Sequence, residues 1–236
     1  MSKGSILQRN AIRPIYNITP FTLLDFPDKT ACIIWFAGCN MRCQYCYNPD
    51  IVQGKGKLFL NQALEFIQSR KNLLDGVVLS GGECTLHKEA FILAREAKKM
   101  GMLVKVDTNG SLPMRLQLLL DYNLVDYVAL DFKSLPKNYH MITGAYEFSN
   151  FEKSLHLLIH SKIDFEVRTT VHSDLISQED LHRMVKFLEK RAYTGNYYLQ
   201  AFINDVPTIG NMGPSENLGN VEKLSTDKIK VIKRES

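Results

Sequence analysis

The sequence lacks any long hydrophobic run. Its longest uninterrupted apolar stretch is the seven residues 31–37, whereas a membrane-spanning helix needs roughly 20. Residues 1–10, MSKGSILQRN, carry no apolar segment behind their early charge, so no secretory signal is expected. We therefore expect a cytoplasmic protein, in a reducing compartment, with no membrane partner.

Disordered and fibrous classes are excluded by composition. The chain has 236 residues, of which 45% are hydrophobic and 23% charged, which is typical of a globular domain. A chain of this length buries roughly 70 to 75% of the surface that its unfolded form exposes. It can therefore build a core without disulfide bonds.

An excess of charge of one sign is also absent. The 29 basic and 25 acidic residues leave a net charge of +4, which argues neither for nor against nucleic-acid binding, and no nucleic-acid partner is expected. Residues 204–220, rich in Asn, Gly and Pro, predict a long terminal loop. The basic residues that follow, Lys228, Lys230, Lys233 and Arg234, are expected to form a solvated or frayed tail.

The cysteines are few, odd in number and unevenly spaced. They are Cys32, Cys39, Cys43, Cys46 and Cys84, and three of the five fall within eight residues. In a chain without an export signal this pattern does not favour disulfides.

Short apolar, β-branched runs alternate with segments of helical period from about residue 30 to residue 203. The predicted strands are 30–36, 76–79, 103–106, 125–130, 164–170 and 197–202, and the predicted helices are 61–72, 87–100, 113–122, 150–161 and 177–190. This alternation predicts an α/β fold with a parallel sheet. No linker or repeat divides the chain, so we expect one domain: a unit over 1–203 with its core at about 30–203, and 204–236 as a loop and basic tail of the same domain.

Polar residues follow the predicted strands. The segments AGCNMRCQYCYNPD, SGGECT, DTNGS and DFKS come after the first four, and the last two strands carry Arg168 and Gln200. In parallel α/β folds the carboxyl ends of the strands meet on one face, where chemistry gathers. The pattern therefore predicts a functional site on that face.

Cys39, Cys43 and Cys46 form C-x3-C-x2-C in one loop, a spacing that lets three thiolates converge on one centre. Structural zinc needs four protein ligands, and neither a fourth Cys nor a His lies near the loop, so zinc is a minor alternative. Three unrelated packing cysteines would lie on one face of a helix or strand. A four-iron cluster held by three cysteines leaves one iron open to a small molecule, and it is the favoured interpretation.

These residues resemble the radical S-adenosylmethionine (SAM) superfamily, whose motif C-x3-C-x-aromatic-C is matched by Cys39, Cys43, Tyr45 and Cys46. The resemblance implies an open, partial (β/α)6 TIM-like barrel of the radical SAM type. It also implies a [4Fe-4S] cluster on the three cysteines and SAM as the second cofactor. The turn of Gly81, Gly82 and Glu83 resembles the one that receives the methionyl amino group, and glycines allow a ligand to approach the backbone.

Within that superfamily the chain resembles the activating enzymes of glycyl radical enzymes, above all those of anaerobic ribonucleoside-triphosphate reductase. The resemblance covers roughly residues 15–203 and rests on TPFTLLDFP, FAGCNMRCQYCYNP, SGGE, TNG and DFK. The chain departs from the family at Cys84, where a proline is usual, and at Asp28 after Pro27. We expect Cys84 to fill the space of that proline as a small hydrophobic residue and not to act as a fourth ligand.

The resemblance implies that the open iron binds SAM and that one electron cleaves the sulfonium into methionine and a 5'-deoxyadenosyl radical. That radical takes a hydrogen atom from a glycine of a separate enzyme. It further implies that Asp131 accepts from the methionyl ammonium and that Lys133 pairs with the carboxylate, although a salt-bridged surface pair is the simpler alternative. No protein side chain beyond the residues that hold the cluster and SAM is expected to be catalytic.

Three further residues are weaker candidates for SAM binding. Tyr45 is expected to present its backbone and ring to the adenine, and Asn109 and Arg168 to reach the ribose or carboxylate from neighbouring strand ends. His87 and His172 are expected in surface or helix-start positions.

The resemblance implies a protein partner, since an open barrel has a lateral gap through which a loop of another enzyme can reach SAM. The expected partner is anaerobic ribonucleotide reductase, with flavodoxin or ferredoxin as electron donor. The alternatives are an activator of the pyruvate formate-lyase type and a small-molecule enzyme such as a 7-carboxy-7-deazaguanine synthase.

Overall fold

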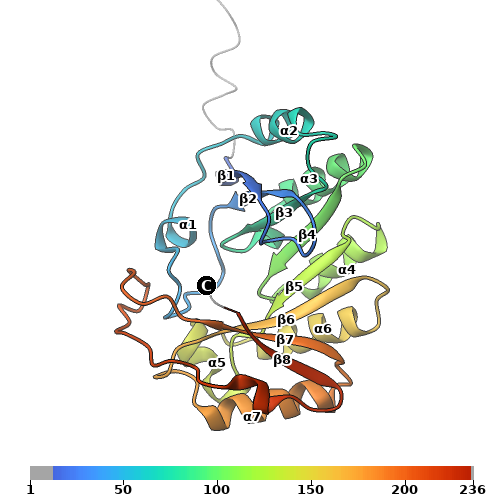
Figure 1. Cartoon of the computed structure of the whole chain (residues 1–236). Helices are drawn as coiled ribbons and strands as arrows, with labels where there is room; N and C mark the ends of the chain where they lie inside the picture. Colours follow the sequence, from blue (N-terminus) through green and yellow to red (C-terminus); the bar gives the residue numbers. More distant parts are fainter. Residues whose placement is uncertain (1–12, 235–236) are drawn as a thin grey trace, which may run out of the picture.

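The computed structural model describes residues 13–234, so the expectation about residues 1–10 lies outside the described residues. Its centre is one eight-stranded sheet in which the strands follow each other in chain order (Figure 1). The strands are β1 Ile15–Thr22, β2 Ala31–Phe36, β3 Gly76–Gly81, β4 Leu103–Thr108, β5 Tyr127–Asp131, β6 Asp164–Val171, β7 Gly195–Ala201 and β8 Ile229–Arg234.

Strands β2 to β7 are the six predicted strands, and they pair in parallel, which confirms the α/β prediction. The sheet gains two strands that were not predicted: β1, antiparallel to β2, and β8, parallel to β7. Within residues 13–234, β1 and β8 are not paired with each other, so the sheet stays open.

Strand β1 escapes prediction because its sequence, IYNITPFT, mixes polar residues and a proline. Proline is tolerated only where its missing N–H is not needed, as on an edge strand. The pairing of β1 with β2 has register shifts between Ile15 and Asn17 and between Thr19 and Thr22. An irregular edge strand of this kind gives no clean alternation in the sequence.

The expectation of a frayed basic tail is wrong. Residues 229–234 form β8, whose Ile229 and Val231 are fully buried. Arg234 binds both carboxylate oxygens of Glu166 on β6, at 2.9 and 3.1 Å. The lysines alternate with apolar residues along β8, and this period of two is the signal that the charge cluster concealed.

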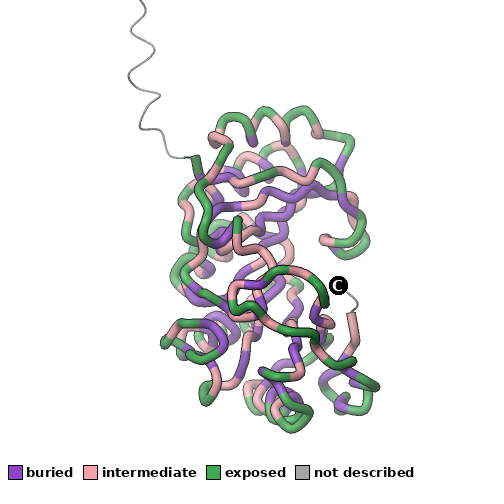
Figure 2. Tube along the Cα trace, turned by 90° about the vertical axis from the view of Figure 1, so that its left-hand side faces the viewer, coloured by how far each residue is buried: buried purple, intermediate pink, exposed green. Residues whose placement is uncertain are grey.

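Seven α-helices connect the described strands, and the five longest of them cover the outside of the sheet (Figures 1 and 2). The five predicted helices correspond to α2 Leu60–Ser69, α3 Lys88–Lys99, α4 Pro113–Asp121, α6 Phe148–Ile159 and α7 Gln178–Lys190. The short helices α1 Pro49–Gln53 and α5 Pro136–Thr143 were not predicted. Both start on a proline, which is favourable in a first helical turn. None of the helices in residues 13–234 is long and apolar enough to cross a membrane.

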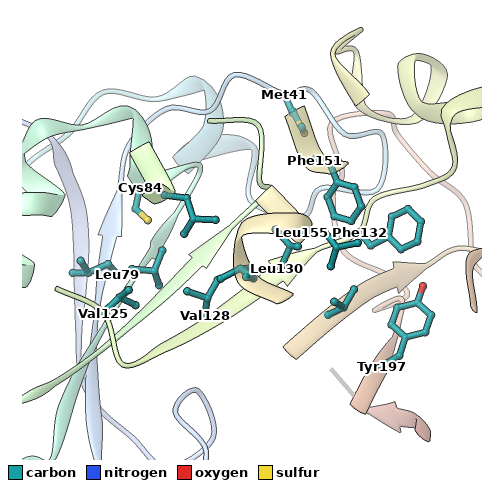
Figure 3. Packing of buried hydrophobic residues seen from close by; sticks show 14 of the residues in the cluster. Met41, Leu79, Cys84, Val125, Val128, Leu130, Phe132, Phe151, Leu155 and Tyr197 are labelled. Carbon is teal, nitrogen blue, oxygen red and sulfur yellow. The ribbon is translucent and has the colours of Figure 1, made fainter. Parts of the chain in front are cut away.

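The main hydrophobic core lies between the outer face of the sheet and the helices (Figure 3). In it, the rings of Phe132 and Phe151 stack with centroids 4.8 Å apart. Cys84 is buried in this cluster, as predicted, and so is Cys32. The inner face has only a small apolar cluster, formed by Phe26, Ala31, Ile33 and Val78. Most of the remaining inner positions of β4, β5 and β6 are therefore free to carry polar side chains.

Candidate active site

A cavity of about 240 Å³ opens at the carboxyl ends of the parallel strands. Ten of the eleven predicted site residues line it: Cys39, Cys43, Tyr45, Cys46, Gly81, Gly82, Asn109, Asp131, Lys133 and Arg168. Glu83 does not. The other half of the lining was not among the predicted ligand residues: Asp25, Trp35, Met41, Tyr47, Asn48, Val52, Ser80, Asp107, Thr170 and Gln200. Of these, Ser80, Asp107 and Gln200 belong to the polar strand ends noted in the sequence. A larger hollow of about 1000 Å³ between α4 and α6 contains none of the predicted residues.

The cysteine loop, residues 37–48 between β2 and α1, is held in place on two sides. On one side its amides at Arg42 and Gln44 donate to carbonyls at the end of α5, at 2.7 and 2.9 Å. On the other side the carbonyls of Gln44 and Cys46 accept from the amides of Gly210 and Ile209, at 2.8 and 3.0 Å. We call residues 208–213 the terminal strap.

The strap is anchored in turn by His172, which is fully buried and whose Nε2 lies 2.9 Å from the carbonyl oxygen of Gly213. The expected surface or helix-start role of His172 is therefore wrong. The companion His87 does precede helix α3, as expected, and its Nε2 lies 2.7 Å from the carbonyl oxygen of Ala37.

The three cysteines fit an iron–sulfur cluster. All are free thiols that line the same cavity. In the described part of the chain, no three His, Cys, Asp or Glu side chains are arranged to hold a single metal ion. Burial raises the pKa of Cys39 to about 12 and that of Cys43 to about 11. Both thiols are therefore protonated at neutral pH in the metal-free protein, and a metal that binds them must displace these protons.

The Gly81–Gly82 turn packs against the cysteine loop. A β-carbon on Gly82 would lie 2.0 Å from the carbonyl oxygen of Gly38, and one on Gly81, where φ is +127°, 2.3 Å from that of Phe36. Both glycines are therefore required by the protein's own backbone, as well as facing the cavity.

Glu83 is turned away from the cavity, and its side chain is almost fully buried. Its carboxylate accepts from the amide and hydroxyl of Thr85, the hydroxyl of Thr108 and the amide of Asn109, at 2.6 to 3.2 Å. Burial raises the pKa of this carboxyl, and the four hydrogen bonds oppose the shift. Glu83 thus ties the turn after β3 to the loop after β4.

Asn109 is connected to the cysteine loop by a hydrogen bond to Asn40, a residue that was not predicted. Its Nδ2 donates to Oδ1 of Asn40 at 3.0 Å, and it lies 3.8 Å from Sγ of Cys39. Asn40 in turn donates to the hydroxyl of Ser111 at 2.8 Å. The signal for Asn40 was its position directly after the first cysteine.

Five charged side chains from neighbouring strand ends form one cluster on the cavity wall and floor. Asp131 accepts from Nε of Arg168 at 2.5 Å and from Nζ of Lys133 at 3.0 Å. Arg168 also reaches Asp107 at 3.3 Å, and Lys105 donates to the same carboxylate. Lys133 and Asp131 are therefore not a simple surface pair. Three cations and two anions leave a net positive charge, which favours the negative thiolates of the neighbouring cysteines, and the mixed signs can pair with a ligand that carries both an acidic and a basic group.

The charges in this cluster stabilise each other. Burial acts to raise the pKa of Asp131, but Arg168 and Lys133 outweigh it and hold the pKa at about 2. The pKa of Asp107 is lowered because Arg168 and Lys105 outweigh its burial. Burial acts to lower the pKa of Lys133, and Asp131 raises it well above its usual value. The carboxylates and Lys133 are therefore ionised at neutral pH.

Tyr45 is largely buried beside this cluster, with Lys133 Nζ 5.8 Å from the ring centroid. Its hydroxyl has no hydrogen-bond partner. Because a buried polar group is rarely left unpaired, the cavity fits a ligand with a polar atom at this point.

Comparison with known proteins places the chain in a family. The model of the radical SAM superfamily matches residues 33–190. The chain is 32% identical to the "Putative glycyl-radical enzyme activating enzyme MJ1227" of Methanocaldococcus jannaschii, over 73% of this chain and 74% of that protein. It is also 32% identical to the pyruvate formate-lyase-activating enzyme of Clostridium pasteurianum, over 55% of this chain and 57% of that one.

Solved structures show the same fold. Streptococcus suis SuiB bound to S-adenosylmethionine superposes with a TM-score of 0.67 at 12% identity, over 86% of this chain and 51% of that one. Native anSMEcpe with bound AdoMet gives a TM-score of 0.58 at 20% identity, over 71% of this chain and 49% of that one. The chain thus spans about half the length of these two neighbours. Its open α/β sheet is the partial barrel of radical SAM enzymes, which use a [4Fe-4S] cluster and SAM. The chain belongs to the radical SAM superfamily of enzymes, among relatives named as glycyl-radical enzyme activating enzymes.

Proposed function

We propose that this enzyme generates the glycyl radical of anaerobic ribonucleoside-triphosphate reductase. The observation that carries the proposal is the cavity itself, in which the three cysteines lie beside a cluster of basic and acidic side chains that complements the carboxylate and ammonium of SAM. Relatives named as activating enzymes support the class of reaction, and the motifs FAGCNMRCQYCYNP and TNG support the reductase as the target.

In this proposal Cys39, Cys43 and Cys46 hold the cluster. Lys133 binds the carboxylate of SAM and Asp131 its ammonium, and Arg168 keeps Asp131 ionised and oriented. The bound cluster and SAM together supply one-electron cleavage of the sulfonium and abstraction of a hydrogen atom. Flavodoxin or ferredoxin is the proposed electron donor.

The remaining SAM contacts are assigned to residues that line the cavity. Gly81 and Gly82 offer backbone to the methionyl group, and Tyr45 and Asn109 contact the adenosine. Glu83 acts indirectly, since its carboxylate fixes the two loops that carry these groups. We further propose that the chain forms a single domain and acts in the cytoplasm; the pairing of β8 with β7 supports one domain over the described residues 13–234.

A second candidate target is pyruvate formate-lyase, favoured by the match to activating enzymes of that name. A 7-carboxy-7-deazaguanine synthase activity has a narrower basis, since the 36% identity to the Rhodospirillum rubrum enzyme covers 37% of each chain.

The test uses protein reconstituted with iron and sulfide without oxygen, then mixed with SAM and a low-potential reductant. One sample receives anaerobic ribonucleotide reductase, a second pyruvate formate-lyase, and a third the deazaguanine precursor. We expect a glycyl doublet in the electron paramagnetic resonance spectrum of the first sample only. A doublet in the second alone, or turnover in the third alone, would reassign the target.

A further inference from the structure

Two neutral polar side chains of the cavity, those of Thr170 on β6 and Gln200 on β7, have no part in the SAM contacts proposed above. Both line the cavity, and both residues are half-buried. Within residues 13–234 neither side chain makes a hydrogen bond, whereas the hydroxyl of the neighbouring Thr169 donates to the carbonyl oxygen of Phe132 at 2.6 Å. The donors and acceptors of Thr170 and Gln200 are therefore available to a ligand in the cavity.

The register of the sheet places these two side chains next to each other. Thr170 and Gln200 are Cα partners in the parallel pairing of β6 with β7. Arg168 and Tyr198 form the pair two residues before them, and side chains two residues apart share one face of a strand. At about 3.3 Å per residue, Thr170 and Gln200 lie roughly 6 to 7 Å nearer to the carboxyl ends of the strands than Arg168. They form a neutral pair beyond the charge cluster.

The cavity reaches both ends of the open sheet. Gln200 belongs to β7, next to the last strand β8, and Asp25 and Trp35 come from the other end of the sheet, after β1 and on β2. In the described part of the chain β1 and β8 are not paired with each other. A polypeptide segment that enters between these two edges therefore meets Thr170 and Gln200.

A protein that binds a glycine must recognise its main chain, because glycine has no side chain. Each peptide unit offers one N–H donor and one C=O acceptor. The primary amide of Gln200 matches this pair, since its oxygen accepts and its nitrogen donates, and the Thr170 hydroxyl can do either. Neither side chain carries a charge that would compete with SAM for Lys133 or Asp131.

We propose that Thr170 and Gln200 bind the main chain of the substrate protein at or beside its reactive glycine. The Gln200 amide pairs with one peptide unit, and the Thr170 hydroxyl bonds to a neighbouring one. The inference rests on the proposed function only in requiring a polypeptide substrate. It holds equally for the reductase and for pyruvate formate-lyase, and it fails for a deazaguanine precursor, which has no main chain.

The test compares Gln200→Met and Thr170→Val with a matched control, Thr169→Val. The first two variants remove hydrogen-bonding groups that have no partner in the protein, so the melting temperature should stay within about 1 °C of the wild type. The control removes a buried hydroxyl that donates to Phe132 and lies 2.7 Å from the Tyr197 hydroxyl. It should lower the melting temperature by about 3 °C or more.

The kinetic readout is the initial rate at which the glycyl doublet forms as the concentration of substrate protein increases. It is measured with anaerobic ribonucleotide reductase and with pyruvate formate-lyase. For the protein that is activated, Gln200→Met should raise KM about tenfold and Thr170→Val about two- to tenfold, the equivalent of one or two hydrogen bonds. The affinity for SAM, measured by calorimetry, should be unchanged in both. Thr169→Val should keep the wild-type KM despite its lower melting temperature.

An unchanged KM in both Gln200→Met and Thr170→Val would overturn the inference. An equal loss of affinity for SAM and for the substrate protein would also overturn it, because both residues would then belong to the SAM site. Turnover of the deazaguanine precursor, with no doublet on either protein, would remove the inference together with the proposed function. A doublet on pyruvate formate-lyase alone would remove only the named target, and the KM values measured with that protein would then decide the inference.

Discussion

Arg168 of β6 and Asp131 of β5 are direct partners across the sheet, with Nε 2.5 Å from Oδ1, and this contact joins the two halves of the charge cluster. Without the guanidinium, the Asp131 carboxylate would retain only its ion pair with Lys133. The Asp107 carboxylate would retain its ion pair with Lys105 and the hydrogen bond from the Ser80 hydroxyl, at 3.0 Å.

Replacing Arg168 by methionine should therefore lower the free energy of unfolding by about 3 kcal/mol, because two largely buried carboxylates each lose a cation. Urea unfolding at neutral pH measures this. Arg183→Met is the control, since its pair with Glu179 is exposed and should contribute less than about 0.5 kcal/mol. Equal losses in both variants would contradict the buried role of Arg168.

Lys133 and Lys105 offer a matched pair of variants in one charge cluster. Lys133 lines the cavity, whereas Lys105 is buried beneath it and bonds to Asp107. Lys133→Ala should weaken SAM binding at least about tenfold, the value of one charge-assisted hydrogen bond, with iron content unchanged. Lys105→Met should reduce stability more than SAM affinity. Calorimetry and iron analysis measure both, and equal loss of SAM and iron in Lys133→Ala would indicate a structural lysine.

The stability of the protein should fall in acid through Asp131. Its folded pKa of about 2 lies below the unfolded value of about 3.9, so the carboxylate stabilises the fold above pH 4 and this contribution is lost as the pH falls from about 4 to 2. The loss should be about 2 to 3 kcal/mol, measured by chemical unfolding across that range. In Asp131→Asn this part of the pH dependence should disappear, and an unchanged slope would refute the assignment.

The terminal strap should control how firmly the cysteine loop is held. A β-carbon on Gly210 would lie 2.8 Å from Cβ of Gln44, whereas one on Gly213 meets nothing within 4 Å. Gly210→Ala should speed hydrogen exchange at residues 209 and 210 about tenfold or more and accelerate the loss of iron to a chelator. Gly213→Ala should behave like the wild type. If both variants retain iron equally well, the strap does not support the site.

Cys84 should be replaceable without loss of iron. It is buried in the core, outside the cavity, and its Sγ donates to the carbonyl of Asp107 at 3.4 Å. Cys84→Ala should retain the full cluster and lose about 1 kcal/mol of stability for the small space left behind. Cys43→Ala should lose the cluster and the formation of 5'-deoxyadenosine. Iron and sulfide analysis of both variants measures the cluster content. A loss of iron in Cys84→Ala would identify Cys84 as a cluster ligand.

The sequence pattern was sufficient for the repetitive part of the fold. Parallel strands buried on both faces read as apolar runs, and the helices between them have a clear period, so β2 to β7 and five helices were predicted. Strand β8 was obscured because its lysines resemble a solvated tail, although Ile229 and Val231 alternate with them. Helix α5 is too short for its period to be read.

Site residues that lie close together in one loop or motif could be predicted from the sequence. Contacts between side chains of different strands could not. The three cysteines are close in the sequence, so their spacing was enough. The partnership of Asp107 with Arg168 depends on the alignment of β4, β5 and β6, which periodicity does not specify. For Glu83 the motif identified the position but not the direction of the side chain. That direction follows from the hydrogen-bond donors of Thr108 and Asn109, at the end of β4.

The strap that holds Gln44 and Cys46 comes from a segment made much later in synthesis. Residue 210 is 164 positions beyond residue 46, which at ribosomal rates of about 5 to 20 residues per second corresponds to roughly 10 to 30 s. During that interval a nascent chain presents its three thiols before the strap that holds their loop exists. Iron delivery, or oxidation by air, therefore meets a looser loop on the ribosome than in the finished enzyme.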